Sequence, residues 1–187
     1  MELILGSASP RRKKLLKEMG FDFNVVIPDV AEVYSPELET ENVAPFLAKL
    51  KANNLKSALY KDQLLICCDT VVINKDEILG KPIDSEDAFN TLKKLSGKKH
   101  NVMSAVCMVI NDNMIEFKET TSIEFKALSN AEIEHYIETY KPFDKAGSYG
   151  IQEWLGHIGI SSIKGSYTNV MGLPTQRLYL EIMKLDS

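Results

Sequence analysis

The chain is poor in cysteine and contains no paired cysteine motif. Its three cysteines, Cys67, Cys68 and Cys107, include no C-x-x-C spacing, and two of them are adjacent within an apolar run. Cysteines in this setting are expected to act as small buried hydrophobic residues. Because disulfides persist mainly in oxidising compartments, this usage predicts a protein of a reducing compartment.

Membrane and secretion signals are also missing. No stretch approaches the roughly 18 consecutive apolar residues of a membrane-spanning helix. The first residues, Met1 to Gly6, lack the basic and then apolar layout of a signal peptide. We therefore expect a cytoplasmic protein with no membrane partner.

Neither strong charge nor low complexity marks the sequence. Its 187 residues include 22 Lys and Arg and 26 Asp and Glu, which gives a net charge of -4. This balance disfavours a uniformly basic nucleic-acid-binding protein. With 44% hydrophobic and 26% charged residues and no repeat or linker, the chain is typical of a globular protein with a buried core. Its length favours one domain over residues 1–187.

Helix and strand patterns alternate along most of the chain. Strands are expected at residues 2–6, 21–27, 64–73, 102–110, 116–125 and 156–163. Helices are expected from Ser9-Pro10 to Gly20, at 43–59, at 84–97, from the capping box Ser129 and Glu132 to Tyr140, and at 173–185. A turn at Asn111-Asp112-Asn113 would join two long strands as a hairpin. The order predicts an α/β layered fold with a mixed sheet.

The start of the first predicted helix carries four cations at residues 11–14. Ser9 suits the N-cap and Pro10 the first helical position, but the helix dipole is already positive there. An anion would remove this conflict, and the hydroxyls of Ser7 and Ser9 with free backbone N–H groups and two guanidinium groups would bind phosphate. A solvated basic face is an equally good interpretation, because no glycine-rich phosphate loop is present.

Asp69 lies inside the apolar run 64–73, where an ionisable group is costly unless it is paired, protonated or bound to a metal. This favours a functional role, although two short strands with Asp69-Thr70 in a turn would also explain the pattern. Glu32, in the loop before the second predicted helix, would bring the second carboxylate that Mg²⁺ needs beside phosphate oxygens and water. Alone, Glu32 is weak evidence, because most loop glutamates are solvated.

Two further segments carry polar groups in loops. Lys81, between Gly80 and Pro82, is a point charge suited to phosphate, although a plain turn is the commoner explanation. The segment 144–152 combines glycines, charges, an aromatic residue and the amide of Gln152. That composition suits either a pocket for a nucleotide base or a packed Ω-loop.

Several separate segments of the chain resemble the Maf family, also called septum formation inhibitor or nucleoside triphosphate pyrophosphatase proteins, and they follow one another in the family's order. Each motif is weak alone, but their ordered combination covers nearly the whole chain. The matching segments are Ser7-Ala8-Ser9-Pro10-Arg11-Arg12, Glu32, Lys51-Ala52, Asp69-Thr70-Val71-Val72, Ile78-Leu79-Gly80-Lys81-Pro82, Leu95-Ser96-Gly97, 144–152 and 165–174.

The resemblance implies an α/β fold like that of the inosine triphosphate pyrophosphatases: a mixed, elongated sheet flanked by helices, with two lobes and a central cleft. It also implies hydrolysis of dTTP and UTP, and of modified pyrimidine nucleotides, to the monophosphate and pyrophosphate with a divalent cation, Mg²⁺ or Mn²⁺. The family's older name suggests a link to septum formation, and the resemblance implies a house-cleaning role linked to septum formation or cell division arrest. Whether the chain forms a homodimer is left open.

The resemblance also assigns residue roles. Asp69 would be the proton acceptor and, with Glu32, a metal ligand, and Lys81 would assist catalysis. Arg11, Thr70 and Gln152 fall on positions that separate a branch acting on thymidine and uridine triphosphates from one acting on 7-methyl-guanosine triphosphate. In the second branch Trp and Gln replace Arg11 and Thr70. Phosphate would be bound by Ser7, Arg12, Lys51 and Lys81. Departures from the family pattern are Cys68, Ser104 and Glu153.

Two other classes of function compete with an enzyme. A nucleotide-binding regulator of septum formation would bind the same substrate without turnover, but it needs no proton acceptor such as Asp69. A nucleic-acid-binding module would use residues 11–14. The net charge of -4 and the lack of interleaved aromatic residues near that segment argue against it.

Overall fold

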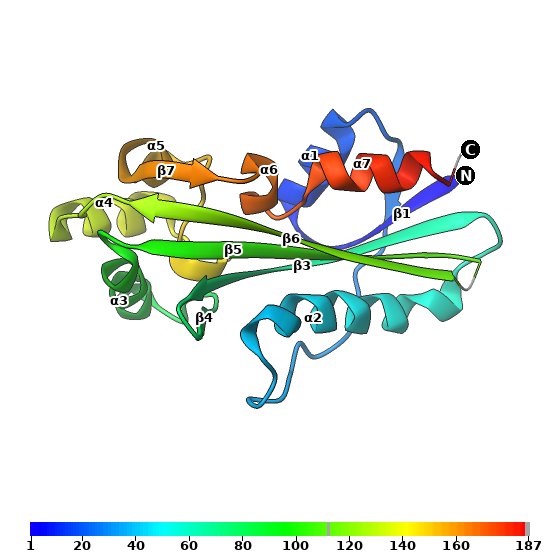
Figure 1. Ribbon diagram of the computed structural model, residues 1–187, viewed down its shortest axis with the longest axis horizontal. Coiled ribbons are helices and arrows are strands. Elements are labelled where there is room, and N and C mark those ends of the chain that lie inside the picture. Colours follow the sequence, from blue (N-terminus) through cyan, green and yellow to red (C-terminus); the bar gives the residue numbers. More distant parts are fainter. Residues whose placement is uncertain (112, 186–187) are drawn as a thin grey trace. The chain divides into compact units, whose positions relative to one another are not determined.

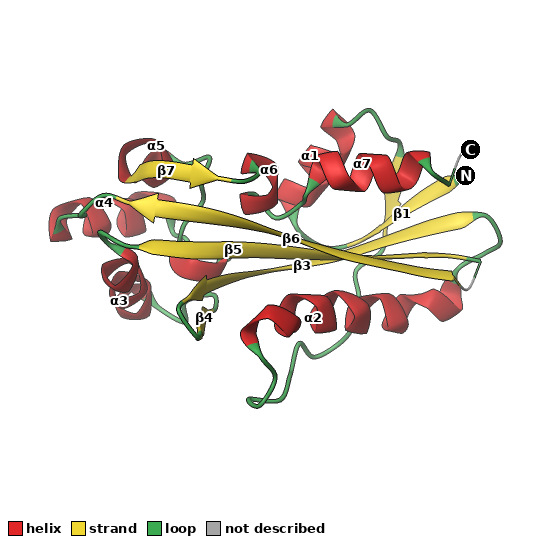
Figure 2. Ribbon diagram, viewed as in Figure 1, coloured by secondary structure: helices red, strands yellow, loops and turns green. Residues whose placement is uncertain are grey.

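The computed structural model describes residues 1–111 and 113–185, and its helices and strands alternate as the sequence predicts (Figures 1 and 2). The strands are β1 Glu2–Gly6, β2 Phe23–Val25, β3 Gln63–Asn74, β4 Glu77–Leu79, β5 Lys99–Ile110, β6 Asn113–Phe125 and β7 Ile160–Lys164. The helices are α1 Pro10–Glu18, α2 Thr40–Leu55, α3 Ser85–Leu95, α4 Asn130–Tyr140, α5 Trp154–Gly159, α6 Tyr167–Val170 and α7 Thr175–Met183. Two 3₁₀ turns, η1 Lys56–Ala58 and η2 Ala146–Ser148, complete the described part.

The strands form one mixed sheet in the order β2-β1-β3-β5-β6-β7, with β4 paired to β3 outside this path. β1 runs parallel to β2 and β3, whereas the β3–β4 and β6–β7 pairs are antiparallel. Gly6 is the register partner of Cys67. The chain therefore leaves β1, at Ser7, next to the part of β3 that carries Asp69 and Thr70.

β3 is a single strand of 12 residues, and 10 of them are buried. A strand in the interior of a helix-covered sheet needs apolar side chains on both faces, which accounts for its nearly continuous apolar sequence. The alternative of two short strands with Asp69-Thr70 in a turn is therefore wrong. Asp69 is held in the middle of a buried strand.

The chain divides into two compact units, and neither is continuous in sequence. Unit 1 comprises Met1–Thr70, Ser104–Glu119 and Gly172–Ser187, and unit 2 comprises Val71–Met103 and Thr120–Met171. In unit 1, α2 lies on one side of the strands, and α1 and α7 lie on the other (Figure 1). In unit 2, α3 packs against α4 and η2 (Figure 2). The single domain and the cleft between two lobes remain predictions.

Local capping signals are confirmed. Ser9 caps α1 and accepts a hydrogen bond from the Arg12 backbone N–H at 3.4 Å, with Pro10 at the first helical position. Asp84 caps α3 in the same way. Ser129 and Glu132 form the reciprocal capping box of α4. These ends are set by neighbouring residues, so the sequence alone locates them.

One predicted strand is right only in its second half. Of the strand expected at 156–163, residues 160–163 lie in β7, whereas residues 156–159 belong to the helix α5. Trp154, Leu155 and Ile158 all pack against the apolar core of unit 2, and Leu155 is fully buried. Helical spacing brings these side chains to one face, which an alternating strand would not do. Packing therefore overrides the local preference.

Smaller differences concern element ends. β2 is shorter than the predicted strand at 21–27, and α2 begins at Thr40 and includes Pro45. The terminal helix expected at 173–185 is α7, Thr175–Met183, and the short helix α6 before it is not predicted. In the predicted hairpin turn Asn111 has a positive φ of 45°, and Asp112 lies outside the described residues.

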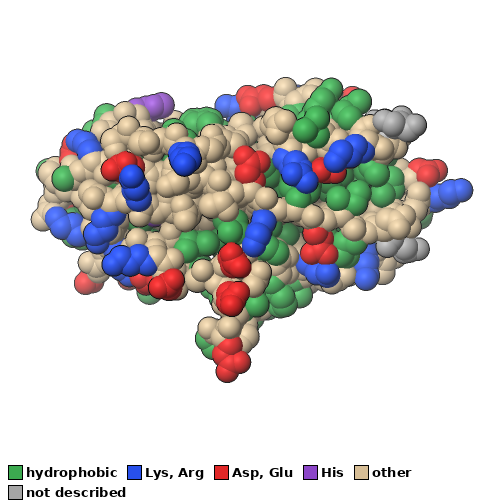
Figure 3. Space-filling model, in the orientation of Figure 1, with side chains coloured by type: hydrophobic (Ala, Val, Ile, Leu, Met, Phe, Trp, Pro, Cys, Tyr) green, Lys and Arg blue, Asp and Glu red, His purple; other side chains and the backbone are tan. Residues whose placement is uncertain are grey.

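Surface and core agree with a globular chain. All three cysteines are buried and not bonded to one another. No helix within residues 1–111 and 113–185 combines the length and apolar character that a bilayer crossing requires. On the face drawn in Figure 3, the cationic and anionic side chains of the described residues are interspersed, without a continuous basic surface.

Candidate active site

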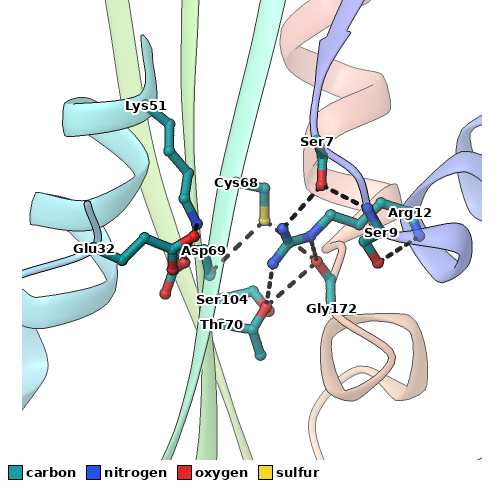
Figure 4. A network of polar contacts seen from close by, with 10 residues as sticks. All are labelled: Ser7, Ser9, Arg12, Glu32, Lys51, Cys68, Asp69, Thr70, Ser104 and Gly172. Atoms are coloured by element: carbon teal, nitrogen blue, oxygen red, sulfur yellow. Dashed lines mark hydrogen bonds and ion pairs between the residues drawn. The ribbon is translucent and has the colours of Figure 1, made fainter. Parts of the chain in front are cut away.

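Asp69 lies at the centre of a compact group of charges. Its side chain is 9% exposed, and its Oδ1 is 2.5 Å from Nζ of Lys51, which reaches it from α2. The same Nζ is 3.0 Å from Oε1 of Glu32, a loop residue whose side chain is 48% exposed (Figure 4). One buried ammonium thus bridges two carboxylates that are 37 positions apart in the sequence.

Burial raises the pKa of the Asp69 carboxyl, because desolvation disfavours its charged form. The positive charges of Lys51 and then Arg12 oppose this effect without cancelling it. A carboxylate with a raised pKa is a better proton acceptor than an ordinary aspartate. Perturbed carboxyls of this kind are common at catalytic sites.

Arg12 is the centre of a second polar network in unit 1 (Figure 4). Its Nη1 donates to Ser7 Oγ at 3.2 Å and its Nη2 donates to Thr70 Oγ1 at 3.0 Å. Its Nε donates to the Gly172 carbonyl at 2.9 Å. Thr70 Oγ1 also lies 2.8 Å from Ser104 Oγ. The guanidinium is therefore fixed by the turn after β1, by β3 and by the segment before α7.

Gly172 has a specific role in this network. Its φ of +107° lies in a region that side chains rarely adopt, and an added Cβ would lie 3.4 Å from Thr70 Oγ1. Its carbonyl also accepts a hydrogen bond from the Cys68 thiol, with Sγ at 3.3 Å. Cys68, which departs from the family pattern, thus helps to hold the Gly172 carbonyl beside Arg12.

The β1–α1 connection is shaped by two serines. Ser7 is buried, and its Oγ accepts from the Ser9 backbone N–H at 3.2 Å. Ser9 in turn caps α1. The capping role of Ser9 is confirmed, while phosphate binding by this turn remains a prediction. Arg11 is partly exposed in the first turn of α1.

Unit 2 brings together Lys81 and the loop that carries Gln152. The backbone N–H of Gly147 donates to the Gly80 carbonyl at 3.0 Å, which ties the 144–152 loop to the segment before Lys81. Lys81 is exposed. The Gln152 side-chain oxygen is buried and has no hydrogen-bond partner within the described residues. A buried amide oxygen without a partner is costly, so this atom is a good candidate for a ligand contact.

The 144–152 loop is held in place by hydrogen bonds and ion pairs that no sequence motif predicts. Tyr136 on α4 donates from its hydroxyl to Glu153 and accepts from the Gly150 N–H at 2.9 Å. Lys145 lies 2.7 Å from Asp144 and 3.1 Å from Glu153. Glu153, another departure from the family pattern, therefore fastens the Gln152 loop to α4. Tyr136 could not be singled out from its neighbours in the chain, because the contact joins separate elements.

The structure thus assembles six of the predicted residues into two groups. Glu32, Lys51 and Asp69 form the first, and Ser7, Arg12 and Thr70 form the second, all within unit 1. Lys81 and Gln152 lie in unit 2. The cation bridge at Lys51 is not visible in the sequence pattern, because it depends on how α2 packs against β3.

The carboxylates fit a hard divalent cation. Two carboxylate oxygens converge on one ammonium, so both already face a single cationic group. No group of three or more His, Cys, Asp or Glu side chains in the described part of the chain is placed to hold a metal. Glu32 and Asp69 therefore suit Mg²⁺ or Mn²⁺ only when phosphate oxygens and water supply the remaining ligands.

Comparison with known proteins identifies the family. A family model described as "Maf-like protein" matches residues 2–185. The chain belongs to the Maf-like protein family. A Maf-like relative from Phocaeicola vulgatus, named dTTP/UTP pyrophosphatase, is 45% identical over 185 residues, which cover 98% of this chain and 96% of the relative. One of the same name from Flavobacterium johnsoniae is 44% identical over 178 residues, covering 95% and 92%.

A solved structure supports the fold of this Maf-like chain. The Staphylococcus aureus Ham1 protein aligns over 100% of both chains with a TM-score of 0.55 and 16% sequence identity. At that identity the likeness concerns the fold alone. It confirms the predicted α/β class with a mixed sheet flanked by helices.

Proposed function

We propose that this Maf-like protein is a hydrolase that cleaves dTTP and UTP to the monophosphate and pyrophosphate, and acts also on modified pyrimidine nucleotides. The observation that carries the proposal is the buried Asp69 carboxyl beside Lys51 and Glu32. The names of the relatives at 44–45% identity support the substrate class. A cytoplasmic location beside the nucleotide pool, in a house-cleaning role linked to cell division, belongs to the same proposal.

Glu32 and Asp69 would hold Mg²⁺ or Mn²⁺. When bound, such an ion lowers the pKa of a coordinated water and offsets charge on the phosphates. Asp69 would accept the proton of the attacking water, for which its raised pKa is suited. The water oxygen would form a bond to the α-phosphorus. The bond between the α-phosphorus and the oxygen that bridges it to the β-phosphorus would break, and this oxygen would leave as part of pyrophosphate.

Positive side chains would hold the triphosphate and stabilise the charge that develops on the leaving group. Lys51, Arg12 and Lys81 are the cations proposed for this role, with the Ser7 hydroxyl as a further donor. Arg12 is already oriented by three hydrogen bonds. A donor fixed before the reaction needs little reorganisation, which is the main source of electrostatic catalysis.

The base would be read by Gln152, with Arg11 and Thr70. The Gln152 amide offers an acceptor oxygen and donor N–H groups, which match the N3–H and a carbonyl of uracil or thymine. Its buried oxygen without a partner supports this role. Thr70 bonds to Arg12, Ser104 and Gly172, so it would act on specificity through this network.

The deciding experiment incubates the protein with dTTP, UTP, CTP, dATP and GTP in Mg²⁺ or Mn²⁺ and measures pyrophosphate and inorganic phosphate separately. The expected result is pyrophosphate from dTTP and UTP that stops when a chelator is added. Release of inorganic phosphate with a nucleoside diphosphate would show cleavage of the wrong bond. Tight nucleotide binding without turnover would instead support a regulator.

A further inference from the structure

Lys51 occupies the position between the two carboxylates where a cation would bind. Its Nζ lies 2.5 Å from Asp69 and 3.0 Å from Glu32. We infer that Lys51 is an internal cation that blocks this site in the ligand-free protein and is displaced when a metal ion and a triphosphate bind together. The inference rests on the proposed function for the identity of the triphosphate, but its first step concerns the free protein alone.

Electrostatics make the ammonium and a divalent cation mutually exclusive at this place. Lys51 and Asp69 side chains are each only 9% exposed, so water screens their charges poorly. A second cation bound to the same oxygens would lie at contact distance from the ammonium. The repulsion has to be relieved by moving Lys51 or by leaving the metal out.

Lys51 can move while its helix stays in place. The α2 backbone is anchored by buried neighbours of Lys51, among them Ala48 and Ala52. The four-carbon lysine stem is flexible and ends in a compact charge. The phosphates of an arriving triphosphate offer that charge a new partner, whereas a free metal ion offers none. Metal alone should therefore bind weakly, and metal with triphosphate should bind cooperatively.

The exchange also controls the proton acceptor. While Lys51 is bound to Asp69, its ammonium occupies one hydrogen-bonding position on the carboxylate oxygen that it faces and weakens that oxygen as a proton acceptor. Transfer of the ammonium to a phosphate releases this oxygen at the moment when the substrate is in place. Lys51 is in this sense a positioning residue, because it determines when Asp69 and Glu32 can serve a metal ion and a water.

The test measures binding of Mn²⁺ alone to the nucleotide-free protein by electron paramagnetic resonance, at about pH 8, which is well above the ordinary pKa of a carboxyl group. Lys51→Met should bind Mn²⁺ at least about tenfold more tightly than wild type, because the competing charge is removed. The matched control is Lys49→Met on the same helix. Lys49 pairs with Glu116 at 2.7 Å, but both side chains are at least 40% exposed. The control should leave Mn²⁺ affinity unchanged.

Equal or weaker Mn²⁺ binding in folded Lys51→Met would overturn the inference. Should that variant fail to fold, the wild-type protein provides a second measurement. The ¹⁵N resonance of the Lys51 ammonium, assigned by its loss in Lys51→Arg, should shift when Mg²⁺ and inorganic tripolyphosphate are added together and change little with Mg²⁺ alone. A resonance that stays fixed in both cases would also overturn it.

These outcomes are separable from the proposed function. Mn²⁺ affinity is measured without nucleotide, so a protein that releases no pyrophosphate can still show the competition. Conversely, the protein could hydrolyse dTTP while wild type and Lys51→Met bind Mn²⁺ with equal affinity. That result would support the proposed function and overturn the inference that Lys51 is an internal cation.

Discussion

The carbonyl of Gly172 accepts a hydrogen bond from Nε of Arg12 at 2.9 Å, although the two residues are 160 positions apart. This bond ties the first turn of α1 to the segment before α7. The carbonyl is presented by a backbone conformation, φ +107°, that glycine adopts readily and other residues rarely do. One of the three hydrogen bonds that orient the proposed phosphate-binding Arg12 therefore depends on one distant glycine.

Gly172→Ala should lower stability by about 1–3 kcal/mol because of its left-handed backbone, and it should also raise the Michaelis constant for dTTP by moving Arg12. Gly20→Ala is the matched control. Gly20 also has a positive φ, of 86°, but no atom lies within 4 Å of its added Cβ. Urea unfolding should show a lower free energy of unfolding in both variants. Steady-state kinetics should show a higher Michaelis constant for dTTP in Gly172→Ala alone. Unaltered kinetics in Gly172→Ala would mean that the bond does not orient Arg12.

Asp69→Asn should reduce turnover by roughly 10² to 10⁴-fold while nucleotide binding is kept, because an amide cannot accept the proton. The fold should persist, since Glu32 still pairs with Lys51. Single-turnover kinetics and equilibrium binding separate the two effects. Near-normal turnover would move the proton acceptor elsewhere, and Glu32→Gln would be the next variant to measure.

Arg12→Ala and Lys81→Ala should both raise the Michaelis constant and lower the rate, because phosphate is held before and during the reaction. Lys14→Ala is the control: Lys14 is a cation of the same helix α1 as Arg12, but its side chain is 68% exposed and lies 3.8 Å from Glu18. It should behave as wild type in steady-state assays. A Lys14→Ala defect as large as that of Arg12→Ala would indicate a general charge effect instead of a specific phosphate contact.

Gln152→Ala should reduce the preference for UTP over CTP by about tenfold or more, since one well-placed polar contact is worth about 1–3 kcal/mol. Cytosine presents an amino group and an unprotonated N3 where uracil presents a carbonyl and N3–H. Catalytic efficiencies for dTTP, UTP and CTP decide the matter. If all three fall together, Gln152 only supports its loop.

His100 should make stability depend on pH. Burial lowers its pKa from 6.5 to about 4, and its Nε2 is paired with the Tyr149 hydroxyl at 2.7 Å. Between these values the unfolded chain binds a proton that the folded chain does not, so the free energy of unfolding falls as pH drops from 6.5 toward 4, by up to about 3 kcal/mol. Urea unfolding of wild type and His100→Phe across this range should show the difference. His157→Gln, at an exposed site, should retain the wild-type pH dependence.

Local signals in the sequence are sufficient for much of the fold. The caps at Ser9 and Ser129 lie where the sequence predicts them, and Asp84 caps the helix that the sequence predicts to begin there, because capping involves residues three positions apart. The apolar run 64–73 forms one strand because a strand covered on both faces needs such a run. The same run makes Asp69 conspicuous in the sequence, since a carboxyl group is rare among so many apolar neighbours.

Packing between distant elements decides the rest. The pattern at 156–163 suggests a strand, and only the core of unit 2 selects the helix α5. Nothing near Lys51 in the sequence indicates that its ammonium bridges Asp69 and Glu32, and nothing near Gly172 indicates Arg12. The sequence determines which charged and polar groups are present and which helices and strands the neighbouring residues form. Which groups meet in a buried, weakly screened place depends on the register of β1 and β3 and on the packing of α2, which are properties of the whole chain.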